Sequence, residues 1–153
     1  MKTIKLLMCA LSLFLLSSCG VVGGSSPERS VKEFLDQIIE INQEQKEYMK
    51  LVRAGRNVDQ EAWVKLNTDA MEKYTKLHCY QGVPAVEIET GAPQRFLSNI
   101  ILSLAELENY TVESVMLSED NESATVVVSH NIGNDINFML KRVDGRWFLE
   151  ILG

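Results

Sequence analysis

Two histidines and one cysteine are the side chains of this sequence best suited to acid–base or nucleophilic chemistry. His78 or His130 would serve an enzyme as general base, because imidazole titrates close to neutral pH. Cys79 directly follows His78, and on a helix the two side chains would point about 100° apart, a poor geometry for chelating a metal. The sequence therefore assigns no catalytic residue, metal or cofactor, and acid–base catalysis by a histidine stands as an alternative function.

The start of the chain has the features of a secretory signal peptide. Lys2 and Lys5 precede an apolar run at residues 6–16. The run is about half the ~20 residues that a membrane-spanning helix requires. It ends in Leu16, Ser17, Ser18 and Cys19, in that order.

This ending resembles the lipobox of bacterial lipoproteins, in which a leucine and two small residues precede a cysteine. The resemblance implies removal of residues 1–18, lipid on Cys19 and attachment of the protein to a membrane of the cell envelope. Gly20 follows the cysteine, which favours the outer membrane if the host is Gram-negative. Residues 21–26 are rich in glycine and serine, so residues 19–26 are predicted to form a flexible tether and residues 27–153 the folded domain.

Charge narrows the classes of partner. The signal segment holds two of the 15 basic residues and no acid, so the remainder carries 13 basic and 21 acidic residues, a formal charge of −8. Such a surface argues against nucleic acid as a partner and against lying flat on anionic lipid. Cys79 is the one cysteine left after Cys9 is removed and Cys19 is blocked, and we expect it to be buried as a small apolar side chain.

Helical patterns fill residues 27–107. The first helix is predicted from Pro27 to about residue 54, with Ser26 as its cap. A second is predicted from Asn57 to before Gly82, and a third, well buried, from Pro93 with its apolar period reaching residue 107. Residues 85–90, between the second and third helices, are predicted to form a short edge strand. The polar stretch 42–50 of the first helix is expected to project beyond the core.

Alternating apolar residues predict strands at residues 110–117, 124–129, 136–141 and 146–152. Asp144 and Gly145 form a two-residue hairpin signal. This turn predicts four cross-strand pairs, namely Val143 with Arg146, Arg142 with Trp147, Leu140 with Leu149 and Phe138 with Ile151. A five-residue turn at 131–135 would pair Val128 with Phe138. Helices followed by an antiparallel meander indicate an α+β fold.

The C-terminal half has a recognisable sequence pattern. It reads ESATVVVSH at residues 122–130 and INFMLKRVDGRWFLEIL at residues 136–152. This resembles small bacterial lipoproteins of unknown function in the nuclear transport factor two-like superfamily, which share the ending of apolar strand, Asp-Gly-basic-Trp and apolar strand. The resemblance implies a cystatin-like fold, in which N-terminal helices pack on a curved antiparallel sheet that forms a cone. Fold alone does not give function.

These observations favour a lipid-anchored binding or interaction module whose partner is a protein or a small apolar ligand. If the cone holds a pocket, its candidate lining residues lie on apolar faces; they are Trp63, Tyr74, His78, Phe96, His130 and Trp147. A third hypothesis is an immunity protein or an accessory subunit of an envelope complex. Its surface would be formed by residues 42–56 and the acidic residues Glu106, Glu108, Glu113, Glu119, Asp120 and Glu122.

Overall fold

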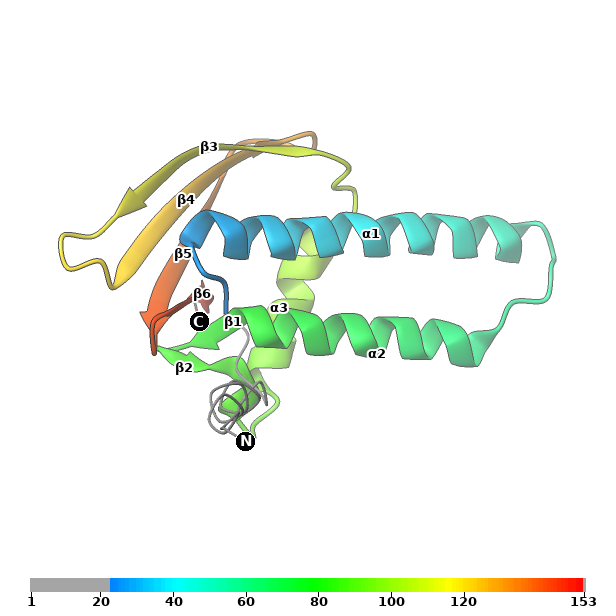
Figure 1. Cartoon of the computed structure of the whole chain (residues 1–153). Helices are drawn as coiled ribbons and strands as arrows, with labels where there is room; N and C mark the ends of the chain where they lie inside the picture. Colours follow the sequence, from blue (N-terminus) through cyan, green and yellow to red (C-terminus); the bar gives the residue numbers. More distant parts are fainter. Residues whose placement is uncertain (1–22, 153) are drawn as a thin grey trace, which may run out of the picture.

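Three helices pack against one mixed sheet of six strands (Figure 1). The structure is a computed structural model and describes residues 23–152. The sheet order is β2-β1-β6-β5-β4-β3. The elements in chain order are α1 (Pro27–Arg53), α2 (Gln60–Leu77), β1 (His78–Tyr80), β2 (Val83–Pro84), η1 (Ala85–Glu87), α3 (Ala92–Ser103), β3 (Tyr110–Leu117), β4 (Ser123–His130), β5 (Ile136–Val143) and β6 (Arg146–Ile151).

The two long helices begin at side-chain caps. Ser26 accepts a hydrogen bond from the backbone N–H of Arg29 and Asp59 accepts one from that of Ala62, so each cap satisfies an amide of the first turn. The prediction for α1 is confirmed. The predicted start of α2 at Asn57 is wrong by three residues, because Asp59 is the residue that caps the helix.

The segment after α2 differs from its prediction. The helical period was expected to continue through His78, yet residues 78–80 form β1, which pairs in parallel with the end of β6. The edge strand predicted at residues 85–90 is also wrong. The short strand β2 precedes that segment, and residues 85–87 form the single 3₁₀ turn η1. Pairing with β6 supplies backbone hydrogen bonds that local helical propensity cannot outweigh.

Helix α3 is shorter and less buried than its sequence predicts. It ends at Ser103, and Pro93 and Leu97 are its buried residues, whereas Leu102 is 73% exposed. Leu104 and Leu107 are buried, but they lie in the segment that connects α3 to β3. The long apolar period therefore spans a helix and the turn that follows it.

The meander β3–β4–β5–β6 follows the predicted strands, with one change of register. Val126, rather than Val128, lies opposite Phe138, a shift of two residues that keeps the same side chains on the apolar face. The shift arises because β4 continues to pair with β3 as far as His130, whereas β5 begins at Ile136 opposite Val128. Ser129 and His130 of β4 therefore extend past the last pair with β5.

The β5–β6 hairpin confirms three of the four predicted pairs. Val143 lies opposite Arg146, Arg142 opposite Trp147 and Leu140 opposite Leu149. Asp144 and Gly145 have φ angles of 50° and 78°, the left-handed values that a tight turn of this type requires. The Arg142 guanidinium lies 6.0 Å from the centre of the Trp147 ring, the expected cation–π contact.

Beyond these pairs the sheet opens, and the predicted pair of Phe138 with Ile151 is not formed. The β5–β6 ladder stops at Leu140 and Leu149, while β5 stays paired with β4 and β6 pairs with β1. Residues 136–139 of β5 and 150–151 of β6 therefore diverge. This split between two strands of one sheet is the structural basis of the candidate site.

The residues before α1 are part of the fold rather than a free tether. Gly24 exchanges two backbone hydrogen bonds with Trp147, of 2.9 and 3.0 Å. Strand β1 pairs with residues 149–151 of β6, so Gly24 continues the pairing along β6 where β1 has ended. A Cβ on Gly23 would lie 2.7 Å from the Phe148 ring, and one on Gly24 would overlap the Ser30 hydroxyl. A flexible tether was expected over residues 19–26; Gly23 and Gly24 are buried instead, Ser25 is exposed, and residues 19–22 lie outside the described residues.

Candidate functional site

A cavity of about 350 Å³ occupies the split between β5 and β6. Helix α3 and β1 contribute the remaining walls. Most of its lining is apolar, and the residues are His78, Ile100, Ser103, Leu104, Ile136, Asn137, Phe138, Met139, Leu149, Glu150 and Leu152. Its size lies within the range of small-molecule sites, and its few polar groups suit such a site.

The backbone of the split has unused hydrogen-bonding groups. The tight hairpin places Val143 and Arg146 in a hydrogen-bonded pair, and alternate residues along β5 then direct their N–H and C=O groups toward β6. Asn137 and Met139 lie in this set but beyond the last ladder pair, so they have no ladder partner on that side among the described residues. The cavity therefore has an apolar interior with polar main-chain groups along one wall.

His78 is the buried polar side chain of the cavity wall. It is the first residue of β1 and is 2% exposed, and its ring packs edge-on against Phe34 with the centroids 4.8 Å apart. Its Nδ1 lies 2.7 Å from the carbonyl oxygen of Tyr74. Burial lowers the pKa of His78 to about 4, against the smaller raising effect of this hydrogen bond, so the imidazole is neutral at pH 7.

The six candidate residues do not share one cavity, and His78 is the one that lines the β5–β6 cavity. Trp63 stacks on Tyr48, with 4.3 Å between centroids, in a groove where α1 and α2 extend past the sheet as an arm. Tyr74 borders a separate hollow of about 110 Å³ between α1 and α2. Phe96 stacks on Tyr80 at 5.7 Å, and Trp147 belongs to the core.

His130 is at the end of β4 and belongs to a different environment from His78. Its Nδ1 accepts a hydrogen bond of 3.1 Å from the N–H of Ile132. Its Nε2 is buried and has no partner among the described residues. The structure does not bring the two histidines into one site, since His130 is absent from the cavity lining.

Cys79 is fully buried, as predicted, and is not a member of the main core cluster. Burial, and secondarily the carboxylate of Glu150, raise the pKa of the thiol to about 11. The thiol is consequently a weak nucleophile at neutral pH.

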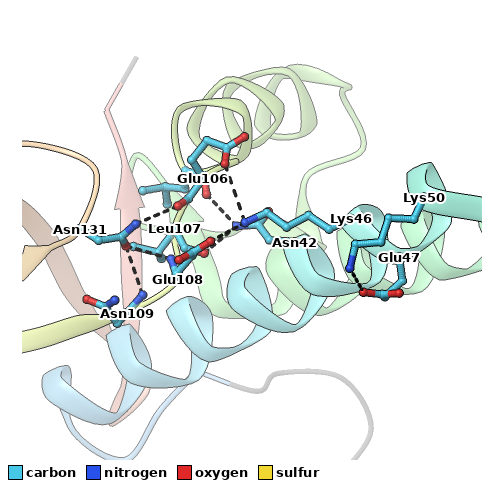
Figure 2. A network of polar contacts seen from close by, with 10 residues as sticks. Asn42, Lys46, Glu47, Lys50, Glu106, Leu107, Glu108, Asn109 and Asn131 are labelled. Carbon is cyan, nitrogen blue, oxygen red and sulfur yellow. Dashed lines mark hydrogen bonds and ion pairs between the residues drawn. The ribbon is translucent and has the colours of Figure 1, made fainter. Parts of the chain in front are cut away.

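Two asparagines fix the connector between α3 and β3 (residues 104–109), which holds α3 in place as a wall of the cavity (Figure 2). Asn42 is buried and donates to the carbonyls of Leu104 and Leu107, at 2.9 and 3.1 Å. Asn131 accepts hydrogen bonds from the N–H groups of Glu108 and Asn109, at 2.9 and 3.2 Å, and donates to the Glu106 carbonyl at 3.0 Å.

The proposed acidic surface is partly neutralised within the protein. Lys46 on α1 lies 2.6 Å from the Glu108 carboxylate and 3.8 Å from that of Glu106. The pKa of Glu108 is lowered by this hydrogen bond and charge. These groups are exposed, so the ion pairs contribute little to stability.

Sequence reasoning missed most of the cavity wall and the role of Asn42. Asn42 lies four residues after Ile38, so it continues the apolar stripe of α1, and that position was the available signal. Ile136, Asn137, Met139 and Glu150 come together only because the ladder opens, which no local pattern encodes.

Comparisons of the chain with protein-family models, with curated proteins and with solved structures found no significant match. Within residues 23–152, no helix combines the length and apolar character needed to cross a membrane. The same residues contain no cluster of three or more His, Cys, Asp or Glu side chains arranged to hold a metal ion.

Proposed function

We propose that this protein is a lipid-anchored module of the bacterial cell envelope that binds a small apolar molecule in the β5–β6 cavity. The cavity itself is the observation that carries the proposal. A sheet whose two central strands part over four residues leaves apolar side chains such as Ile100, Ile136 and Leu149 around about 350 Å³ of space. Filling such a space with an apolar molecule is favourable because it removes apolar surface from water.

We also propose a cystatin-like fold of the nuclear transport factor two-like superfamily. The order of elements supports it, with two helices, a short hairpin, a third helix and a four-stranded meander. The curvature of the sheet over the N-terminal part of α1 in Figure 1 is consistent with the cone that this fold implies.

Lipid on Cys19 is the proposed means of attachment. Cys19 lies outside the described residues, and the support is its lipobox-like sequence. Gly24, only five residues later, is fixed to β6 by its bonds with Trp147. A chain extends by at most about 3.6 Å per residue, so Gly24 would stay within roughly 18 Å of the lipidated residue. A lipidated protein would therefore hold its β1–β6 region close to the membrane.

Fractionation tests the anchor. The full-length protein should be found with membranes, and Cys19→Ala should release it or leave it as uncleaved precursor. Cys79→Ala is the control, because that thiol is buried within the domain. Membrane attachment that persists unchanged in a processed Cys19→Ala protein would refute lipid on this cysteine.

Nuclear magnetic resonance tests the cavity independently of the anchor. The chain from residue 19, carrying Cys19→Ala, contains every described residue and is titrated with methyl heptyl ether, a neutral apolar probe. The largest amide shifts are expected at Ile100, Asn137 and Met139 around the cavity. Shifts centred on Tyr48 and Trp63 would move the binding site to the groove on the helical arm.

A further inference from the structure

The hydrogen bond of His78 determines which of its ring nitrogens carries the proton. The Tyr74 carbonyl can only accept, so the Nδ1 that lies 2.7 Å away must carry the hydrogen. A neutral imidazole has one N–H, and Nε2 therefore holds a lone pair that can only accept a hydrogen bond.

This acceptor has no hydrogen-bond partner in the part of the chain that the structure describes. His78 is 2% exposed and lines the cavity, and no hydrogen bond to Nε2 is present among residues 23–152. Nε2 of His78 is not one of the fully buried unpaired side-chain atoms among these residues, which are Gln37 Oε1, Gln94 Oε1 and His130 Nε2, so a ligand donor would take the place of water there. The cavity lining thus includes an acceptor without a described protein partner, in surroundings that are otherwise mainly apolar side chains.

The charge at the cavity disfavours anionic ligands. Among the described residues of its lining, Glu150 is the one charged residue, and no lysine or arginine contributes. A carboxylate ligand would meet a like charge and no cation to compensate it. Fatty-acid anions are therefore disfavoured, although their chains would suit the apolar walls.

We propose that the ligand is a neutral, predominantly apolar alcohol or phenol whose hydroxyl group donates to Nε2 of His78. This inference rests on the proposed function, since it names the class of molecule that the β5–β6 cavity takes. Its size is limited, because about 350 Å³ corresponds to about a dozen water volumes of ~30 Å³ each. A hydrocarbon body of roughly ten non-hydrogen atoms would contact Phe138, Leu104 and Leu149.

Three probes of equal or similar size separate the hydrogen bond from apolar burial. They are 1-octanol, its isomer methyl heptyl ether and octanoate, each titrated calorimetrically at pH 7 into the chain from residue 19 with Cys19→Ala. The ether is the more apolar isomer, so it would bind more tightly if burial alone decided affinity. We expect 1-octanol to bind about tenfold more tightly than the ether, the effect of one added hydrogen bond. Octanoate should bind about tenfold more weakly than 1-octanol, or not measurably.

His78→Asn removes the acceptor and retains the structural bond. The Asn amide can still donate to the Tyr74 carbonyl, but it has no atom in the place of Nε2. We expect this variant to bind both isomers with similar affinity or to prefer the ether. His130→Asn is the matched control, because His130 does not line the cavity, and it should keep the preference for 1-octanol.

The outcomes separate this inference from the proposed function. If the ether binds the wild-type cavity at least as tightly as 1-octanol, or if folded His78→Asn keeps the preference, the assigned role of His78 is overturned. If neither isomer binds, both the role of His78 and the proposed binding of an apolar ligand are contradicted. Should His78→Asn not fold, the ¹⁵N shift of wild-type Nε2 decides, since a hydroxyl donor must move it and the ether must not.

Discussion

His78 donates from Nδ1 to the carbonyl oxygen of Tyr74 across 2.7 Å, and this bond joins the end of α2 to the first residue of β1. It satisfies a carbonyl in the last turn of the helix, where no following helical N–H is available. It also orients the ring against Phe34. The same contact therefore contributes to the helix end and positions the polar group of the cavity.

Acid should destabilise the protein through His78. Its folded pKa of about 4 is lower than the unfolded value of about 6.5, so the unfolded chain binds more protons between these values. The stabilising contribution is complete above pH 6.5 and is lost as the pH falls toward 4. We expect a loss of roughly 3 kcal/mol in the free energy of unfolding, measured with urea at pH 7 and pH 4.

The carboxylates also titrate in this range, so the comparison requires His78→Asn as a control. The variant lacks the imidazole and should lose less stability than the wild type over the same interval. An imidazole of His78 that titrates near pH 6.5 in the folded protein would contradict the prediction.

Cys79 should be protected from thiol reagents. Its pKa of about 11 leaves very little thiolate at pH 8, and the side chain is fully buried. In the mature chain with Cys19→Ala, Cys79 is the remaining thiol. Its reaction with a chromogenic disulfide should be at least about a hundredfold slower in the native protein than in urea. Equal rates in the two states would show that this side chain is accessible.

Asn42→Ala should weaken the connector between α3 and β3. The change removes two hydrogen bonds, after which the Leu104 carbonyl keeps its bond from the Leu107 N–H and the Leu107 carbonyl loses the bond from Asn42. We expect a loss of about 1–3 kcal/mol in the free energy of unfolding. Asn67→Ala is the control, since Asn67 bonds only the Trp63 carbonyl within its own helix, and it should cost less. Equal losses of stability in the two variants would show that Asn42 does not hold the connector in place.

Gly24→Val tests whether residues 23–26 belong to the folded domain. The new Cβ would overlap the Ser30 hydroxyl, whose single hydrogen lies within reach of the Trp147 and Ser26 carbonyls and whose oxygen accepts from the Gly24 N–H. We expect a destabilisation of about 1–3 kcal/mol. Gly91→Ala is the control, because its Cβ would enter open space. If Gly24→Val left the free energy of unfolding unchanged, residues 23–26 would be a free tether.

Local signals explain which parts of the fold were predictable. Asp144 and Gly145 permit few turn geometries, so the register around Val143 and Arg146 followed from the residues themselves. Capping side chains and an apolar period likewise predicted α1. These features depend on residues that are close together in the chain.

The cavity depends on residues that are far apart, which is why it was not predicted. The ladder between β5 and β6 opens where the end of β6 pairs with β1, some 70 residues earlier in the chain. The same pairing places His78 in a strand although it lies four residues after Tyr74 on the helical period. Periodicity predicted that His78 would face the interior, and the long-range pairing determined the element to which it belongs.

The contents of the cavity in the native protein test the central proposal most directly. Full-length protein is purified gently from its own membranes, and bound small molecules are extracted and measured by mass spectrometry. Ser103→Phe places a ring at the cavity wall from an exposed position, and Leu102→Phe is its matched neighbour outside the lining. The proposal predicts one neutral apolar compound at fixed stoichiometry in the wild type and Leu102→Phe, and its loss from Ser103→Phe. No such compound in the wild type, or equal amounts in all three proteins, would contradict a ligand in the β5–β6 cavity.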